Sequence, residues 1–400
     1  MRVLFLTHRL PYAPNRGDRL RAYHIARTLA PTVDLEIVSL AHDAEELAQV
    51  DRLEAIAPRV TAVRVPHARN YAKGLLHLAG QSPLTHVLLD APGLTDTLRR
   101  IVRERPPDAV LAYCSGMARF ALEPPLSRFP LIVDLVDVDS QKWAALSQSS
   151  RWPLRSIYDR ESRHLAQFEQ TMSAAAVATV VVNDREREAL CRLAPSAKIA
   201  VVPNGIDLPP LMPPGAPAER PIVVFCGVMN YTPNVDGALW FCERVWPRIR
   251  AQRSDAELLL VGSHPTRAIR RLHSPANGIE VTGRVDDVRP YLWRSAVAIA
   301  PLLTARGIQN KVLEAVGAGL PAVVSSQVFD GLPTVVRSAC RVGATAGSFA
   351  EAIMSLLAMS AGERRSLAGT AEMQGLTWEA QLRPLRDLLT DCGSRHAIAV

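Results

Sequence analysis

Short runs of apolar residues recur along the first half of the chain, each bounded by polar or turn-forming residues. The segments between them, such as 18–30 and 43–57, have the apolar spacing of helices. Uninterrupted apolar strands that alternate with helices are typical of a parallel sheet covered on both faces. The expected strands are 3–7, 34–39, 108–113, 131–135, 178–182 and 199–203. We therefore expect a doubly wound α/β domain over residues 1–205.

A proline-rich stretch at 211–221 lacks any periodicity and reads as a linker. The alternation of strand and helix then begins again, and predicts a second α/β domain over residues 206–375. Its expected strands are 221–227, 256–262, 279–283, 296–301 and 321–326. We expect the last amphipathic helix, at 376–392, to pack back on the first domain.

Length and composition agree with two globular domains. The chain has 400 residues, of which 48% are hydrophobic and 21% charged, and this is the balance of an ordinary soluble protein. The formal net charge is +7, but lysine and arginine are scattered through both halves. The charge indicates mainly an arginine-rich background, with peripheral contact to the inner membrane as the alternative; we expect no nucleic-acid partner.

The cysteines and the apolar stretches favour a cytoplasmic protein. Six cysteines show no pairing or histidine spacing that would hold zinc, so we expect buried, reduced thiols and no metal. The N-terminus predicts a first strand better than a signal peptide. The longest apolar stretch, 172–182, is too short to span a bilayer.

The most informative stretch for chemistry is 306–326. Gly307 precedes the start of a helix in which Lys311 and Glu314 share a face at i and i+3. Backbone amides at a helix start favour a phosphate, an ammonium can hold a diphosphate, and a carboxylate can accept two ribose hydroxyls. The alternative is a surface Lys–Glu pair worth only a few tenths of a kcal/mol. The spacing alone leaves both readings open.

The segment 307–326, GIQNKVLEAVGAGLPAVVSS, resembles the donor-nucleotide segment of GT-B glycosyltransferases, in particular the retaining family 4 (group 1) enzymes. VVPNGID at 201–207, FCGVMNYTPN at 225–234 and IEVTGRVDDVRPYL at 279–292 resemble further segments of that family in the same order. DLVDVDSQKW at 134–143 resembles a bacterial subgroup of sugar transferases tied to exopolysaccharide assembly. The resemblance implies two Rossmann-like domains facing a cleft.

The resemblance also implies a set of site residues. Glu314 would bind the ribose of a nucleotide diphosphate sugar and Lys311 its diphosphate, and we assign both to the catalytic centre, without a metal or other cofactor. Two departures matter: Arg306 stands where the family usually has a glutamate, and the loop 229–234 lacks the family's basic pair. Further donor contacts are expected at Gly227, Asn230, Arg284, Val285, Arg306, Gly307, Ile308 and Asn310.

The loop after the first strand is a candidate acceptor site. Gly17 allows close backbone approach, and the helix that begins near Asp18 directs its N-terminus at the expected cleft. Arg16, Arg19 and Arg21 would bind an anionic acceptor such as a lipid diphosphate; the alternative is a solvated basic loop.

Two further sets of polar residues lie near expected strand ends. His24 falls within the first helix and is expected to be a packed core residue. Asp134, Asp137 and Asp139 follow the strand at 131–135, and alternate positions on an extended segment point the same way. We expect Asp137 to accept sugar hydroxyls or this segment to cap the next helix, rather than to hold a metal.

The predicted function is transfer of a sugar, with retention of configuration, from a nucleotide diphosphate sugar to a hydroxyl acceptor. The acceptor is expected to be a glycan or lipid-linked sugar in cell-surface polysaccharide synthesis. A non-catalytic nucleotide- or sugar-binding protein and a GT-B epimerase are the alternatives. A phosphorylase is less favoured, because no lysine setting for pyridoxal is evident, and a dehydrogenase because no GxGxxG follows the first strand.

Overall fold

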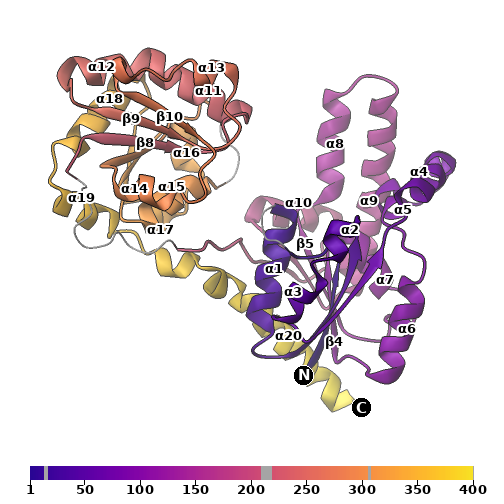
Figure 1. Cartoon of the computed structure of the whole chain (residues 1–400). Coiled ribbons are helices and arrows are strands. Elements are labelled where there is room, and N and C mark those ends of the chain that lie inside the picture. The colour runs from indigo at the N-terminus through magenta and orange to yellow at the C-terminus, as the bar shows by residue number, and fades with distance from the viewer. Residues whose placement is uncertain (13–16, 209–218, 305–307, 400) are drawn as a thin grey trace. The chain divides into compact units, whose positions relative to one another are not determined.

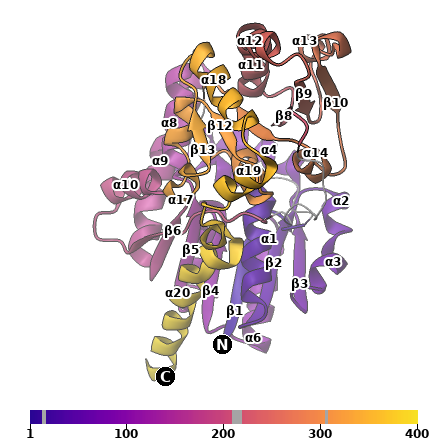
Figure 2. The ribbon, with the colours of Figure 1, turned by 90° about the vertical axis from the view of Figure 1, so that its left-hand side faces the viewer.

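A computed structural model describes residues 1–12, 17–208, 219–304 and 308–399. Contacts between Cα atoms divide the chain into two compact units, Met1–Gly205 with Trp378–Val400, and Ile206–Thr377. In both units helices cover the two faces of a parallel sheet (Figures 1 and 2). The expectation of two doubly wound, Rossmann-like α/β units is confirmed. The proline-rich segment at 211–221 lies mostly outside the described residues.

The first unit is built on a parallel sheet in the order β3-β2-β1-β4-β5-β6-β7. Its strands are β1 (Arg2–Thr7), β2 (Asp34–Ala41), β3 (Arg59–Arg64), β4 (Ala109–Tyr113), β5 (Leu131–Val136), β6 (Ala178–Val181) and β7 (Ile199–Val201). Its helices are α1 (Gly17–Leu29), α2 (Ala44–Leu47), α3 (Val50–Glu54), α4 (His67–Leu76), the 3₁₀ turn η1 (His77–Ala79), α5 (Leu84–Leu88), α6 (Leu94–Glu104), α7 (Ser115–Ala121), α8 (Asp139–Ser149), α9 (Leu154–Ala175), α10 (Asp184–Leu193) and α20 (Trp378–Ala399).

The second unit repeats this plan with the strand order β10-β9-β8-β11-β12-β13. Its strands are β8 (Ile222–Cys226), β9 (Glu257–Val261), β10 (Ile279–Gly283), β11 (Val297–Ala300), β12 (Ala322–Val324) and β13 (Cys340–Val342). Its helices are α11 (Thr232–Trp240), the π segment η2 (Phe241–Val245), α12 (Trp246–Gln252), α13 (Arg267–Arg270), η3 (Pro275–Asn277), α14 (Arg289–Trp293), α15 (Asn310–Gly317), α16 (Ser326–Asp330), α17 (Thr334–Arg337), α18 (Ala346–Leu357), α19 (Ala361–Ala368) and η4 (Met373–Leu376).

The C-terminal helix α20 packs on the first unit, beside α1. Its apolar side chains join the core that β1, β4 and α1 form, and the ring of Trp378 stacks on His24 with centroids 4.2 Å apart. His24 is buried, so its expected role as a packed core histidine is confirmed.

The cysteines are free thiols, and five of them are buried or partly buried. The pKa of Cys114, Cys226, Cys242 and Cys340 is raised to about 12 by burial, which makes these thiols poor nucleophiles. Cys191 is exposed, contrary to expectation, because it lies on the outer face of α10.

Candidate functional site

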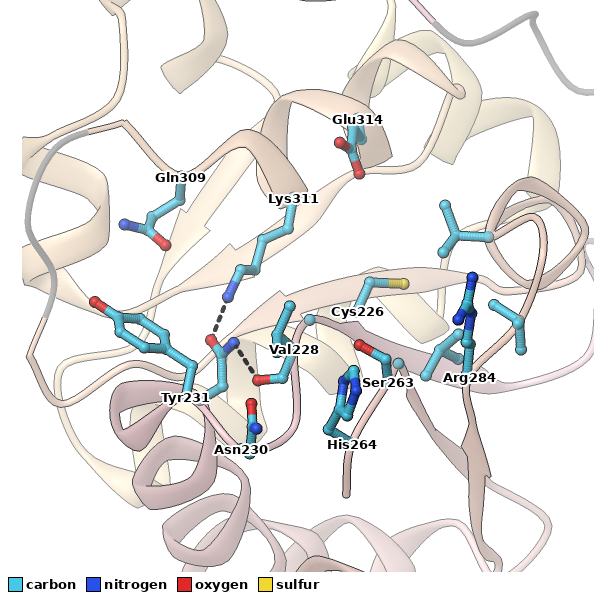
Figure 3. Close-up of a pocket in the computed structure, with 16 residues that line it drawn as sticks. Cys226, Val228, Asn230, Tyr231, Ser263, His264, Arg284, Gln309, Lys311 and Glu314 are labelled. Carbon is cyan, nitrogen blue, oxygen red and sulfur yellow. Dashed lines mark hydrogen bonds between the residues drawn. The ribbon is translucent and has the colours of Figure 1, made fainter. Parts of the chain in front are cut away.

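The main pocket of the second unit lies at the carboxyl ends of its strands. The strand order reverses between β8 and β11, and in doubly wound sheets such a switch point leaves a crevice for ligands. The pocket has a volume of about 920 Å³, within the range of sites for small molecules. Its walls come from residues 226–234 after β8, 261–264 after β9, 284–288 after β10, and 309–314 at the start of α15 (Figure 3).

Two glycines allow the loops after β8 and β9 to touch. Gly262 has φ +152°, and a Cβ atom there would stand 1.7 Å from the carbonyl oxygen of Gly227. A Cβ atom on Gly227 would in turn lie 2.8 Å from Nδ2 of Asn234. A larger residue at position 262 would require a shift of the backbone, and one at position 227 would displace the side chain of Asn234, so both glycines allow this close packing.

Lys311 enters the pocket from the first turn of α15. The helix buries Val312 and Val316 on its other side, which leaves Lys311 and Glu314 on the pocket side. The ammonium donates a hydrogen bond to Oδ1 of Asn234 and lies 5.0 Å from the centre of the Phe225 ring. Burial of the ammonium lowers the pKa of Lys311 to about 8, and neighbouring Glu314 offsets only part of this effect.

Asn234 connects three parts of the site. It is 4% exposed, and besides accepting from Lys311 it donates a 3.0 Å hydrogen bond to the carbonyl oxygen of Val228 (Figure 3). The amide thus fixes the loop after β8 and the end of the lysine side chain at once. A hydrogen bond to a charged donor is worth about 1.5–3 kcal/mol, so this contact orients the ammonium strongly.

Glu314 is an exposed residue, but protein atoms crowd its carboxyl group. This partial burial raises its pKa, while the Lys311 ammonium opposes the rise. Lys311 is directed towards Asn234 and not towards Glu314 (Figure 3). The carboxylate therefore keeps its acceptor oxygens for a ligand, such as the hydroxyls of a sugar ring.

Arg284 supplies a second positive charge on the opposite wall (Figure 3). It is exposed, and within the described part of the chain no ion pair engages it. Together with Lys311, this arginine makes the pocket suited to an anion, because guanidinium and ammonium groups are positively charged.

The structure brings six of the expected donor contacts into this pocket: Gly227, Asn230, Arg284, Val285, Lys311 and Glu314. Ile308 and Asn310 are exposed and do not line it, because the residues of this segment that face the pocket are Gln309, Lys311 and Glu314. Arg306 and Gly307 lie outside the described residues.

Sequence reasoning missed several lining residues, among them Asn234, Tyr231, Ser263, His264 and Gln309. Only one signal was available for Asn234: it follows Pro233 in the first turn of α11, at a helix start beside a strand end. For Ser263 and His264 the sequence offers no signal beyond their position after a strand.

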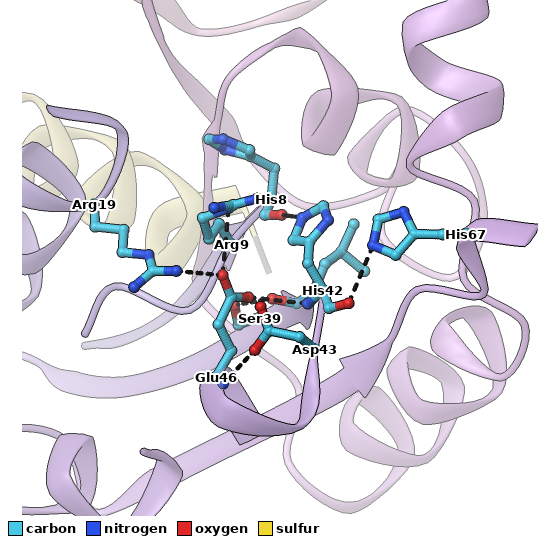
Figure 4. Close-up of polar contacts among 9 residues, drawn as sticks. His8, Arg9, Arg19, Ser39, His42, Asp43, Glu46 and His67 are labelled. Carbon is cyan, nitrogen blue, oxygen red and sulfur yellow. Dashed lines mark hydrogen bonds and ion pairs between the residues drawn. The ribbon is translucent and has the colours of Figure 1, made fainter. Parts of the chain in front are cut away.

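In the first unit, the carboxyl ends of β1 and β2 carry a cluster of ionised and histidine side chains (Figure 4). Buried Glu46 accepts from Arg19 at 2.5 Å and lies 3.4 Å from Arg9. His42 and His67 stack beside this cluster with ring centroids 5.1 Å apart. Arg19 is therefore already engaged by a carboxylate, and an anionic acceptor would have to share it with Glu46.

The other residues expected at the acceptor loop are Arg16, Gly17, Asp18 and Arg21. α1 begins at Gly17 and includes Asp18, while Arg16 lies outside the described residues. Arg21 was expected to bind an acceptor, and this is wrong, because its side chain is 1% exposed and bonds Oδ2 of Asp134 at 2.9 Å. It also donates to the carbonyl of Val202, so it serves the fold.

The three aspartates after β5 do not form one group. Asp134 is taken by Arg21, Asp137 is exposed, and Asp139 accepts a 3.3 Å hydrogen bond from Ser115. Burial raises the pKa of Asp139. Across the described ranges, no three histidine, cysteine or acidic residues gather as a metal site would need.

Comparison with known proteins identifies the fold and a family match within the second unit. The fold is that of the GT-B proteins: sucrose-phosphate synthase from Thermosynechococcus elongatus has a TM-score of 0.64 at 15% identity, over 99% of this chain and 100% of that one. Residues 220–359, which hold most of the pocket, match the family described as "Glycosyl transferases group 1". This match lies wholly within the second unit.

Two further solved structures are similar over nearly their whole length. Anabaena HepE in complex with UDP has a TM-score of 0.62 at 14% identity, covering 98% of this chain and 100% of that one. WaaG, a glycosyltransferase involved in lipopolysaccharide biosynthesis, has a TM-score of 0.55 at 15% identity, with 96% and 98% covered. A comparison with curated protein sequences found no match.

Proposed function

We propose that the protein is a retaining glycosyltransferase that takes a sugar from a nucleoside diphosphate sugar. The observation that carries this proposal is the pocket in which Lys311, Glu314 and Arg284 surround the loop after β8. The group 1 match over residues 220–359 supports the same class of reaction. HepE has been solved with UDP and with UDP-glucose, which supports a nucleoside diphosphate as the ligand here.

In this proposal the diphosphate lies between the loop after β8 and the Lys311 ammonium. Glu314 accepts the ribose hydroxyls, and the base lies towards Arg284 and Val285 at the end of β10. An approaching dianion would favour the protonated form of Lys311, whose pKa burial lowers to about 8 despite the opposing effect of neighbouring Glu314.

The chemical step then needs charge stabilisation more than a protein nucleophile. As the bond to the sugar breaks, negative charge grows on the departing diphosphate, and Lys311, held by Asn234, is placed to neutralise it. In a front-face reaction the leaving diphosphate takes the acceptor proton. The configuration at the transferred carbon is thereby retained, with no metal or other cofactor required.

We further propose that the acceptor is a glycan or lipid-linked sugar of cell-surface polysaccharide synthesis. The acceptor would bind at the first unit, near the carboxyl ends of β1 and β2, and the protein would act in the cytoplasm in peripheral contact with the inner membrane. Within the described residues, no helix has the length and apolar character needed to cross a bilayer.

The first test is calorimetric binding of UDP, GDP, ADP and NAD to the purified protein. We expect one nucleoside diphosphate to bind at micromolar concentration, and Lys311→Ala and Glu314→Ala each to weaken it at least tenfold, about 1.4 kcal/mol. Lys198→Ala removes an exposed lysine of the first unit and should bind as wild type does. Absence of binding, or unchanged binding by both pocket variants, would refute the donor site.

A second measurement separates an enzyme from a binding protein. Release of nucleoside diphosphate from the matching sugar nucleotide should depend on added glycan or lipid-linked acceptor. NMR of the product should show the anomeric configuration of the donor. A donor that binds but is never consumed with any acceptor would favour the non-catalytic alternative.

A further inference from the structure

Large apolar side chains are exposed on two neighbouring parts of the first unit. Tyr71, Leu75, Leu76 and Leu78 lie on α4 and η1, with exposed fractions of 62%, 72%, 82% and 37%. Three more lie on the hairpin of α8 and α9: Leu146 at 39%, Trp152 at 82% and Leu154 at 50%. Single exposed apolar residues are ordinary, but clusters of this kind mark an interaction surface.

These two parts are joined in space by Arg160 of α9. Its guanidinium donates hydrogen bonds to the carbonyls of His77 at 2.9 Å and Ser82 at 3.1 Å, which fixes η1 beside α9. Along the axis of α9, Arg160 lies about 9 Å from Leu154, the first residue of this helix. The hairpin of α8 and α9 projects beyond the sheet (Figure 1). We call the seven exposed apolar residues together the α4–hairpin surface.

Basic residues outnumber acidic residues in and beside the segments that carry this surface, although exposed Asp159, which pairs with Arg163 at 3.2 Å, lines a pocket together with Arg155. Residues 67–82 and 140–158 contain no aspartate or glutamate. The same two segments contain five basic residues, Arg69, Lys73, Lys142, Arg151 and Arg155. Asp90 pairs with Lys73 at 2.9 Å and approaches Arg69 at 4.0 Å, but the three basic residues of the hairpin make no ion pair with another described residue.

From these observations we infer that the α4–hairpin surface docks on an anionic lipid bilayer. Leucine side chains enter the outer acyl region, Trp152 sits at the level of the headgroups, and the arginines contact lipid phosphates. A surface on which basic residues outnumber acidic ones fits the negative surface of a bilayer, and each basic residue near such a surface contributes about 1 kcal/mol. The inference deepens the proposed membrane contact by naming its surface.

The test is flotation of the full chain with vesicles of phosphatidylcholine containing 0, 15 or 30 mol% phosphatidylglycerol. We expect binding that grows with the phosphatidylglycerol fraction and falls in high salt. Leu76→Ser with Trp152→Ser should lower the partition coefficient at least tenfold, and Arg151→Gln with Arg155→Gln by tenfold or more. All four positions are exposed, so thermal unfolding of these variants should match wild type.

Matched controls exclude a general effect of charge or apolar area. Arg100→Gln with Arg103→Gln removes two exposed arginines from α6 of the same unit, and Val342→Ser removes an apolar side chain that is 40% exposed in the second unit. Both controls should bind vesicles as wild type does.

Quenching by brominated phosphatidylcholine gives a second readout at the level of one residue. Fluorescence of the wild type should be quenched on vesicle binding, and most of that quenching should disappear in Trp152→Phe. The inference is overturned if wild type does not float at 30 mol% phosphatidylglycerol, or if both surface variants float as well as wild type. Nucleotide binding is measured on the same samples, so that a failure to bind vesicles can be distinguished from a failure of the donor-site proposal.

Discussion

Replacing Lys311 with methionine should stabilise the ligand-free protein while it removes nucleotide binding. Methionine keeps the apolar stem that packs near Phe225 but carries no charge. In the wild type, burial lowers the pKa of Lys311 from 10.5 to about 8. That difference corresponds to an energetic cost of ~3 kcal/mol for the charged form, which is an upper value because the side chain is only partly buried.

The stability gained by removing the charge is partly offset by the loss of the hydrogen bond that the ammonium donates. The variant loses the hydrogen bond to Asn234 and leaves Oδ1 of that buried amide unpaired, at a cost of about 1–3 kcal/mol. We therefore expect the free energy of unfolding at pH 7 to rise by about 1 kcal/mol. Urea denaturation followed by circular dichroism measures this difference, with exposed Lys198→Met as the matched control.

The pH dependence gives the sharper test. A lysine whose pKa is lower in the folded state binds fewer protons there, so wild-type stability rises with pH between about 8 and 10.5. The variant has no such group, so its advantage of about 1 kcal/mol should vanish below about pH 9, and above that pH the wild type should be the more stable protein. A variant that is less stable at pH 7 by the same margin as at pH 10 would refute a desolvated ammonium at this site.

Two further predictions concern other buried parts of the structure. Gly262→Ala forces a Cβ atom against the backbone of Gly227, so it should lower the free energy of unfolding by about 1–3 kcal/mol and abolish nucleotide binding. The control Gly375→Ala places its Cβ atom in open space and should have neither effect. Burial raises the pKa of Glu169 to about 7, so wild-type stability should fall as pH rises from 4.5 to 7, by up to about 3 kcal/mol. Glu169→Gln, which keeps an acceptor for Ser140, should remove this fall in urea titrations at pH 5 and 8, and an unchanged slope would contradict the assignment.

The interior strands could be predicted from the sequence because both of their faces are covered. β1, β4 and β6 consist of buried residues throughout, and their sequences RVLFLT, AVLAY and ATVV are mostly apolar. The edge strand β3 has the sequence RVTAVR and intermediate burial, and the edge strand β13 has only three residues. The apolar pattern therefore predicts neither of these strands.

The candidate site could be predicted only where its residues are close in sequence. Lys311 and Glu314 lie one turn apart, and their shared face follows from helical geometry. Asn234 is 77 residues from Lys311, and Gly262 meets Gly227 across two different loops. These contacts depend on the order of strands in the sheet, which the apolar pattern leaves undetermined.

Arg21 shows that one wrong expectation was avoidable from the sequence. Ile25 and Leu29 stand four and eight residues after Arg21, so all three occupy one face of α1, and that face is buried against the sheet. Arg19 is two positions earlier, nearly half a turn away. A basic residue on the apolar face of a helix must find a buried acid, as Arg21 finds Asp134.

Lys311 satisfies the opposite condition in α15. It lies beside the apolar face of Val312 and Val316, its ammonium is partly buried, and its hydrogen-bond partner is the neutral amide of Asn234. An ammonium has three donor hydrogens, and its hydrogen bond to the neutral amide of Asn234 does not neutralise its charge. Arg21 is neutralised within the folded chain, whereas Lys311 is partly desolvated without a paired carboxylate, as a binding site for an anionic ligand requires.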